Sequence, residues 1–93
     1  MRRGEVRWYR FQAPDKQRPV VILTRESAIS FLGEITVAPI TTTIRDIPTE
    51  VMLRGGEEMP QDCAINLDHL QTVPKGKIGA LVATLSREKL QLV

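Results

Sequence analysis

The chain has 93 residues, of which 42% are hydrophobic and 26% charged, and its formal net charge of +2 makes it mildly basic. This length predicts one domain over residues 1–93, and the charge permits a nucleic-acid partner without identifying one. The single cysteine, Cys63, excludes a disulfide within the chain. No apolar run approaches the roughly 20 residues of a membrane span or forms a signal-peptide core. We therefore expect a cytoplasmic protein with no membrane association.

The first quarter of the chain predicts two strands. Residues 4–11 read G-E-V-R-W-Y-R-F, and their period of two places Val6 and Trp8 on one face, where Trp8 is expected to join the core. Residues 12–17 are a polar connection that contains a Pro-Asp turn signal. Residues 18–24 carry the continuous apolar run V-V-I-L, which is typical of a strand covered on both faces.

The next segment predicts a short helix and a further strand. Residues 25–32 place apolar side chains at helical spacing but are short, which indicates a helical turn that Gly33 closes. Residues 34–40 form the strand E-I-T-V-A-P-I, and Pro39 predicts that it lies at a sheet edge or contains a bulge.

The remainder of the chain predicts several short strands and one terminal helix. The Gly55-Gly56 and Pro74-Lys75-Gly76 segments mark turns, and Ser86 is a candidate N-cap for the final R-E-K-L-Q-L-V. In all, about six or seven short strands separated by turn signals favour a small, mainly antiparallel β barrel or curved sheet. The strands predicted here cover residues 49–53, 63–67, 70–73 and 78–85.

Several chemistries are excluded by the residues that are present. One cysteine and one histidine, Cys63 and His69, do not supply a zinc site of the usual kind. Gly55-Gly56 is not followed by the Gly-Lys-Ser/Thr of a phosphate-binding loop, and no G-x-S-x-G nucleophile motif occurs. We therefore predict neither a metal nor a cofactor.

Polar residues stand at the ends of two apolar runs. Arg18 precedes V-V-I-L, and Thr41, Thr42 and Thr43 follow the run that ends in A-P-I. If the two strands pair, a guanidinium and a hydroxyl meet at one edge of the sheet, and a guanidinium matches the oxygens of a phosphate. The structural alternatives are an arginine paired with a surface carboxylate and threonines that simply favour strands.

Five segments together resemble the MazF/PemK-type toxins of bacterial toxin–antitoxin pairs. They are R-G-E-V-R-W-Y, Q-R-P-V-V-I-L, V-A-P-I-T-T-T-I-R, A-I-N-L-D-H-L-Q-T-V and I-G-A-L-V-A-T-L-S, in the family's order and over most of the chain. The resemblance implies a mainly β fold with small helices, an SH3-like antiparallel barrel of the PemK/CcdB-like toxin type. It further implies a longer closing helix than this sequence contains, so the C-terminal helix is expected to be truncated.

The same resemblance implies a function. It predicts a homodimer, neutralised by a cognate antitoxin, that cleaves single-stranded mRNA at specific sequences without a metal. In that reaction the ribose 2′-OH attacks the adjacent phosphorus and leaves a 2′,3′-cyclic phosphate and a 5′-OH. The alternatives are a gyrase-poisoning toxin of the CcdB type, or a catalytically degenerate relative that only binds RNA or an antitoxin.

The resemblance also implies roles for individual residues. Arg18 is the expected charge-stabilising catalytic residue, Thr41 the catalytic hydroxyl and Asp68 a third catalytic member. A register slip of one residue would exchange Thr41 for Thr42, and Asp68 is equally well explained as a turn residue. Base readout is expected from residues 12–17 and 45–48. The expected RNA contacts are Arg25, Thr43, Arg45, Asn66 and His69.

Overall fold

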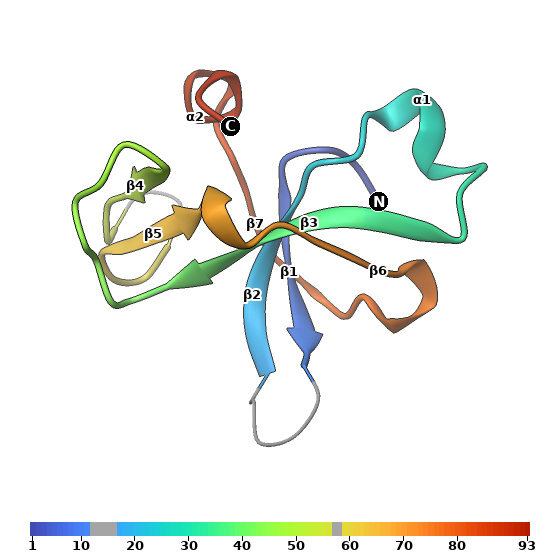
Figure 1. Ribbon diagram of the computed structural model, residues 1–93, viewed down its shortest axis with the longest axis horizontal. Coiled ribbons are helices and arrows are strands. Elements are labelled where there is room, and N and C mark those ends of the chain that lie inside the picture. Colours follow the sequence, from blue (N-terminus) through green and yellow to red (C-terminus); the bar gives the residue numbers. More distant parts are fainter. Residues whose placement is uncertain (12–16, 57–58) are drawn as a thin grey trace.

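The computed structural model describes residues 1–11, 17–56 and 59–93 (Figure 1). Within this part of the chain, seven strands form a strongly curled antiparallel sheet in the order β4-β5-β3-β2-β1-β7, with β6 also paired to β3. The prediction of a small, mainly antiparallel curved sheet is therefore confirmed. The elements are β1 (Glu5–Arg10), β2 (Gln17–Ile22), α1 (Glu26–Ile29), β3 (Glu34–Thr41), β4 (Glu50–Leu53), β5 (Cys63–Asn66), η1 (Leu67–His69), β6 (Gln71–Pro74), η2 (Lys75–Lys77), β7 (Leu81–Thr84) and α2 (Arg87–Gln91).

Strand β2 is covered on both faces, as its apolar run predicts. Val21 packs into a core cluster with Val6 and Ile65, whereas Val20 and Ile22 pack into a second cluster on the opposite face, and all five side chains are fully buried. Alternate residues of a strand point to opposite faces. The curled sheet therefore encloses one core on each side of β2.

Strand β3 lies in the centre of the sheet, so of the two alternatives predicted from Pro39 the edge strand is wrong, whereas the ladder is irregular at Pro39. It pairs with β2 on one side, and on the other side with β6 as far as Val37 and with β5 from Ile40 onward. The amide N–H of Leu23, just after β2, donates to the carbonyl of Thr36 at 2.9 Å, so the backbone polar groups of Thr36 point toward β2. Because this direction alternates along a strand, the backbone nitrogen of Pro39, three residues later, points to the side of β5 and β6. Pro39 lies in the interval between the part of β3 that pairs with β6 and the part that pairs with β5. The sheet therefore loses no hydrogen bond through the N–H that proline lacks.

The three residues of η1 create this interval. The register along β3 shifts by three residues between its pairing with β5 and its pairing with β6, and Leu67–His69 is the inserted segment. Two strands that are consecutive in the chain thus pair with the same side of β3, separated by one outward turn. Polar side chains of this turn are placed beside the middle of the sheet.

The two helices are short, and each is fixed by a few contacts. Helix α1 ends with Ser30 as its C-cap, so Gly33 does not close it as predicted. In α2 the Ser86 hydroxyl accepts the Lys89 amide N–H at 3.2 Å, which confirms the predicted N-cap. The Lys89 ammonium also donates to the carbonyl of Met52 at 2.9 Å, which ties α2 to β4. No helix in the described residues has the length and apolar character needed to cross a membrane.

Trp8 is not part of either core, contrary to the prediction from strand periodicity. Its side chain is 37% exposed, although Val6 on the same face is fully buried. The core cluster around Val6 ends before Trp8, which instead forms one wall of a surface hollow together with Val82 of β7.

Candidate functional site

Arg18 and Thr41 meet where β2 begins and β3 ends. Val20 pairs with Pro39 in the antiparallel register, and the same register continued by two residues places Arg18 opposite Thr41. Cross-strand neighbours of this kind have adjacent side chains. Both side chains line the same two surface hollows, so the strands bring the guanidinium and the hydroxyl to one edge of the sheet.

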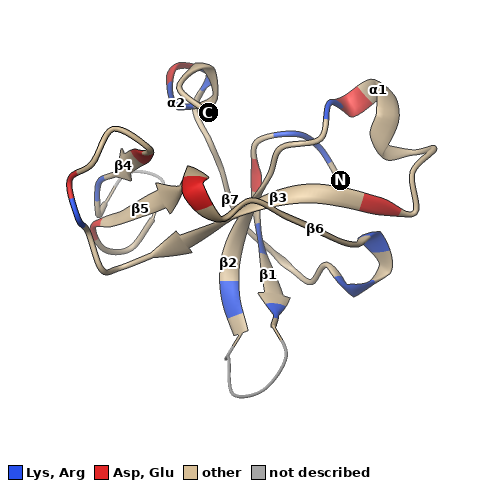
Figure 2. Ribbon diagram, in the orientation of Figure 1, with Lys and Arg blue, Asp and Glu red and all other residues tan. Residues whose placement is uncertain are grey.

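The first hollow, called the polar hollow, has a volume of about 330 Å³. It contains two guanidinium groups and an imidazole, and no carboxylate occurs among its described lining residues. Such a surface attracts anions, and phosphate in particular. Figure 2 agrees, since the end of β1 and the beginning of β2 are coloured for Lys or Arg and not for Asp or Glu. The polar hollow is lined by Phe11, Arg18, Pro39, Thr41, Thr43, Arg45, Asn66, His69 and Gln71.

The second hollow, called the apolar hollow, has a volume of about 380 Å³ and opens on the other face of the sheet. Arg18, Thr41 and Thr43 line both hollows and therefore form a ridge between them, whereas Thr42 lines only the apolar one. The other residues of the apolar hollow are Trp8, Pro19, Ile40, Met59, Pro60, Gln61, Cys63 and Val82.

The η1 turn supplies one wall of the polar hollow. The side-chain oxygen of Asn66, which is only 9% exposed, accepts the backbone N–H of Asp68 at 3.0 Å and so caps the turn. Within the same turn, the Asp68 carboxylate accepts the Thr49 hydroxyl at 2.7 Å and lies outside the described lining of the polar hollow. This contact joins the η1 turn to Thr49, the residue that precedes β4. His69, the residue after Asp68, lines the hollow instead.

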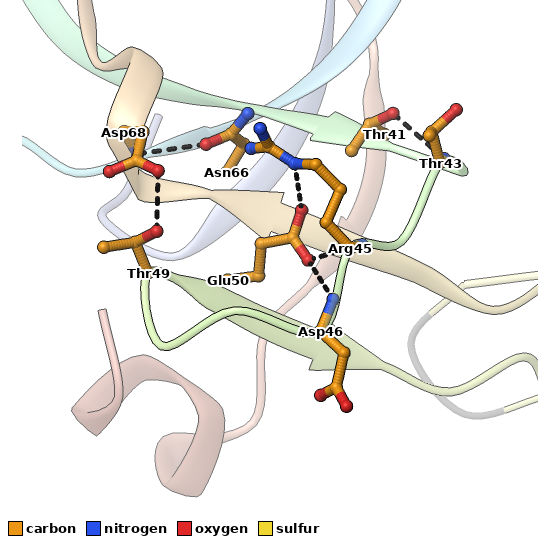
Figure 3. A network of polar contacts seen from close by, with 8 residues as sticks. All are labelled: Thr41, Thr43, Arg45, Asp46, Thr49, Glu50, Asn66 and Asp68. Carbon is orange, nitrogen blue, oxygen red and sulfur yellow. Dashed lines mark hydrogen bonds and ion pairs between the residues drawn. The ribbon is translucent and has the colours of Figure 1, made fainter.

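The loop between β3 and β4 supplies Thr43 and Arg45 to the lining of the polar hollow, and Figure 3 shows its polar contacts. The Thr41 hydroxyl accepts the backbone N–H of Thr43 at 3.1 Å, which starts the loop with a Ser/Thr-type turn. Further along, the Glu50 carboxylate accepts the backbone N–H groups of Arg45 and Asp46 at 2.9 and 3.0 Å, and the Arg45 Nε–H at 3.3 Å. The loop is thus held at both of its ends.

Glu50 is charged at neutral pH in this environment. Burial raises its pKa, but the hydrogen bonds from Arg45 and Asp46 and the charge of Arg45 together outweigh burial and lower the pKa below its usual value. A carboxylate with a lowered pKa contributes its stabilisation above the pKa of the unfolded chain and loses it as the pH falls through the lower folded value. The contact therefore persists throughout the neutral range.

Six of the eight residues predicted for the site line the polar hollow: Arg18, Thr41, Thr43, Arg45, Asn66 and His69. Asp68 is not among the lining residues. Arg25 precedes α1, at the opposite end of β3 from Thr41, and contributes to neither hollow (Figure 1). Of the two loops predicted to read bases, the one at residues 12–17 falls largely outside the described residues.

Phe11 and Gln71 line the polar hollow although the sequence did not single them out. Phe11 packs edge-to-face against Tyr9, with ring centroids 4.9 Å apart. The alternation of β1 continued past Arg10 would have indicated Phe11, because it shares a face with Tyr9, the register partner of Arg18. Gln71 had no local signal, since its position depends on the η1 insertion.

Replacing Asp68 with asparagine tests its role. If Asp68 serves the turn, the variant keeps an acceptor for the Thr49 hydroxyl, and kcat for the RNA cleavage that the family resemblance implies should stay within about threefold of wild type. Removal of a proton-accepting catalytic carboxylate would instead lower kcat by about a hundredfold or more. Thr49→Val, which removes the other partner, should reproduce the small effect. Single-turnover cleavage rates of both variants decide between the two roles.

Among the residues that the structure describes, no group of three or more His, Cys, Asp or Glu side chains is arranged to hold a metal ion.

Comparison with known proteins gives consistent matches over most of the chain. The profile of the family described as PemK-like, MazF-like toxin of type II toxin–antitoxin system matches residues 2–93. Probable endoribonuclease MazF5 of Mycobacterium tuberculosis is 43% identical over 86 residues, covering 91% of this chain and 75% of the relative. Endoribonuclease MazF3 of the same organism is 42% identical over 71 residues, covering 76% and 69%. The structure of Mycobacterium tuberculosis toxin MazF-mt6 superposes with a TM-score of 0.84 at 34% identity, covering 95% of this chain and 86% of that one.

Proposed function

Because this chain belongs to the PemK-like, MazF-like toxins of type II toxin–antitoxin systems, we propose that it is a toxin endoribonuclease that cleaves single-stranded mRNA at specific sequences without a metal. Its relatives in Mycobacterium tuberculosis are named as endoribonucleases. The observation that supports the proposal most directly is the ridge, where Arg18 and Thr41 stand between two hollows. An RNA strand that crosses the ridge meets a cation and a hydroxyl at its phosphate and has a hollow on each side.

Arg18 is the proposed charge-stabilising residue of the reaction. When the ribose 2′-oxygen attacks the adjacent phosphorus, the equatorial phosphorane oxygens gain negative charge before the bond to the 5′-oxygen breaks. A guanidinium offers parallel N–H donors to two of these oxygens and, since it stays protonated, does not act as the base. The products are a 2′,3′-cyclic phosphate and a 5′-hydroxyl.

Thr41 is the proposed catalytic hydroxyl. Its oxygen already accepts the Thr43 N–H, which fixes the orientation of the side chain and leaves its own O–H to donate to the scissile phosphate. The reaction also takes a proton from the 2′-OH and delivers a proton to the leaving 5′-oxygen. His69, whose imidazole lines the hollow, is proposed to accept the 2′-OH proton and then to pass that same proton to the leaving oxygen.

The remaining polar residues of the hollow are proposed to hold the nucleotides around the cut. Arg45 grips a flanking phosphate, and Asn66 offers its amide to a base edge. Phe11 provides a ring on which a base can stack. Arg25, which lies away from both hollows, is proposed only as a contact to a distant phosphate.

The proposed partners follow from the family and the surface. A cognate antitoxin neutralises the toxin by covering the ridge with an acidic segment, which the basic polar hollow would attract. We propose a homodimer as well, because the resemblance to the family implies one. We place the protein in the cytoplasm, where its mRNA substrate is found.

The direct test is incubation of the purified protein with a long single-stranded RNA in EDTA, followed by mapping of the new 5′ ends. We expect cuts at one recurring sequence, with 5′-hydroxyl and cyclic-phosphate termini. RNA that remains intact with the wild-type protein under all metal conditions would refute the enzyme assignment. Inhibition of DNA gyrase in the absence of RNA cleavage would instead favour the CcdB-type alternative.

A further inference from the structure

Glu50 holds the loop between β3 and β4 through an unusual arrangement of donors. Asp46 has a positive φ of 55°, a left-handed conformation that non-glycine residues rarely adopt. In this conformation the successive N–H groups of Arg45 and Asp46 both reach Oε1 of Glu50, at 2.9 and 3.0 Å. Consecutive N–H groups turned inward in this way form an anion-binding nest. The anion in this nest is a side chain of the protein itself.

The other carboxylate oxygen of Glu50 fixes the Arg45 side chain. Oε2 accepts the Arg45 Nε–H at 3.3 Å, while the Glu50 side chain is only 1% exposed and that of Arg45 is 47% exposed. A guanidinium held by its Nε edge presents its two terminal nitrogens elsewhere, and Arg45 lines the polar hollow. Figure 3 shows the side chain extending from the loop across β5 toward Asn66, another residue of that hollow.

We propose that Glu50 is a positioning residue of the RNA site, which holds the strained loop and aims the Arg45 guanidinium at a phosphate that flanks the cleaved bond. This rests on the proposed function. Without Glu50, the Arg45 side chain would sample many rotamers. RNA binding would then have to order this side chain, which weakens the affinity. A contact of equal strength in the bound and transition states changes KM and leaves kcat unaltered.

Two variants of Glu50 separate the loop from the arginine. Glu50→Gln retains an oxygen that can occupy the nest, but its amide N–H₂ then opposes the Arg45 Nε–H, donor against donor. Glu50→Ala removes both contacts. We expect Glu50→Gln to raise KM for RNA about tenfold with kcat within about twofold of wild type. Glu50→Ala should raise KM further and increase hydrogen exchange at the Arg45 and Asp46 amides. Glu34→Gln, at the exposed far end of β3, is the matched control and should leave both constants unchanged.

The decisive experiment repeats the Glu50→Gln substitution in an Arg45→Ala background. If Glu50 acts through Arg45, the second substitution adds less than about twofold to KM. The full tenfold effect in this background, or an unchanged KM in Glu50→Gln alone, overturns the proposal even though cleavage stands. Affinity for an uncleavable oligonucleotide, with 2′-deoxyribose at the cleavage position, gives a second readout by fluorescence anisotropy. If the wild type binds single-stranded RNA without cleaving it, and Glu50→Gln binds the same RNA more weakly, the cleavage activity is refuted while the role of Glu50 in positioning Arg45 for RNA binding is retained.

Discussion

Replacing Arg18 with alanine is expected to lower kcat for RNA cleavage by about 10²–10³-fold, the cost of removing one preorganised donor from a developing negative charge. Arg18 is exposed on β2, so the substitution should leave the fold intact. Single-turnover cleavage of a short RNA that contains one mapped site measures the chemical step directly. KM should change less than kcat, because the phosphorane carries more charge than the phosphate of the bound substrate.

Two further variants make this result specific. Arg18→Lys retains the positive charge but loses the planar pair of donors, so its rate should fall between those of the wild type and Arg18→Ala. Arg87→Ala removes an exposed arginine from α2, outside both hollows, and serves as the matched control for net charge. If Arg87→Ala and Arg18→Ala slow cleavage equally, the effect is one of overall charge, and the catalytic role of Arg18 must be abandoned.

The pairing of Arg18 with Thr41 could be predicted because it depends on two strong local signals. V-V-I-L and the run through A-P-I are both apolar enough to be read as buried strands, and strands that are consecutive in the chain usually lie side by side, here antiparallel. Their polar ends then lie at the same edge of the sheet. The register that places Arg18 opposite Thr41 follows from the hydrophobic pattern, since a slip of one residue would turn buried side chains to solvent.

Other features of the site depend on contacts that no local pattern encodes. Pro39 normally indicates an edge strand, but here the η1 insertion leaves an interval in the ladder of a central strand. Trp8 is exposed because it lines the apolar hollow beside Val82 of β7, and the sequence around Trp8 does not encode this neighbour. Glu50 has the appearance of an ordinary solvent-facing strand residue, and its role emerges only once the preceding loop folds back onto it.

The η1 insertion, Pro39 and the loop held by Glu50 share one location, and this accounts for the position of the polar hollow. A continuous ladder along β3 would have left no room for a hollow between β5 and β6. The η1 insertion, the donor-free backbone of Pro39 and the loop held by Glu50 together open the sheet beside Thr41. The rigid strands hold Arg18 and Thr41 in position, whereas the turn and the loop carry the groups that differ most easily between relatives. Cleavage chemistry and sequence preference are therefore expected to respond to different substitutions.

Replacing Thr41 with valine is the second large effect that we expect, a decrease in kcat of about 10–10²-fold, because the isosteric side chain keeps its volume and loses the donor to the phosphate. The substitution also removes the acceptor for the Thr43 N–H, which loosens the start of the loop. Thr41→Ser retains the hydroxyl and should restore most of the rate, which separates loss of chemistry from loss of shape. Thr42→Val, whose side chain lines only the apolar hollow, should remain within about threefold of wild type. If Thr42→Val or Thr43→Val is slowed more than Thr41→Val, the catalytic hydroxyl has been assigned to the wrong threonine.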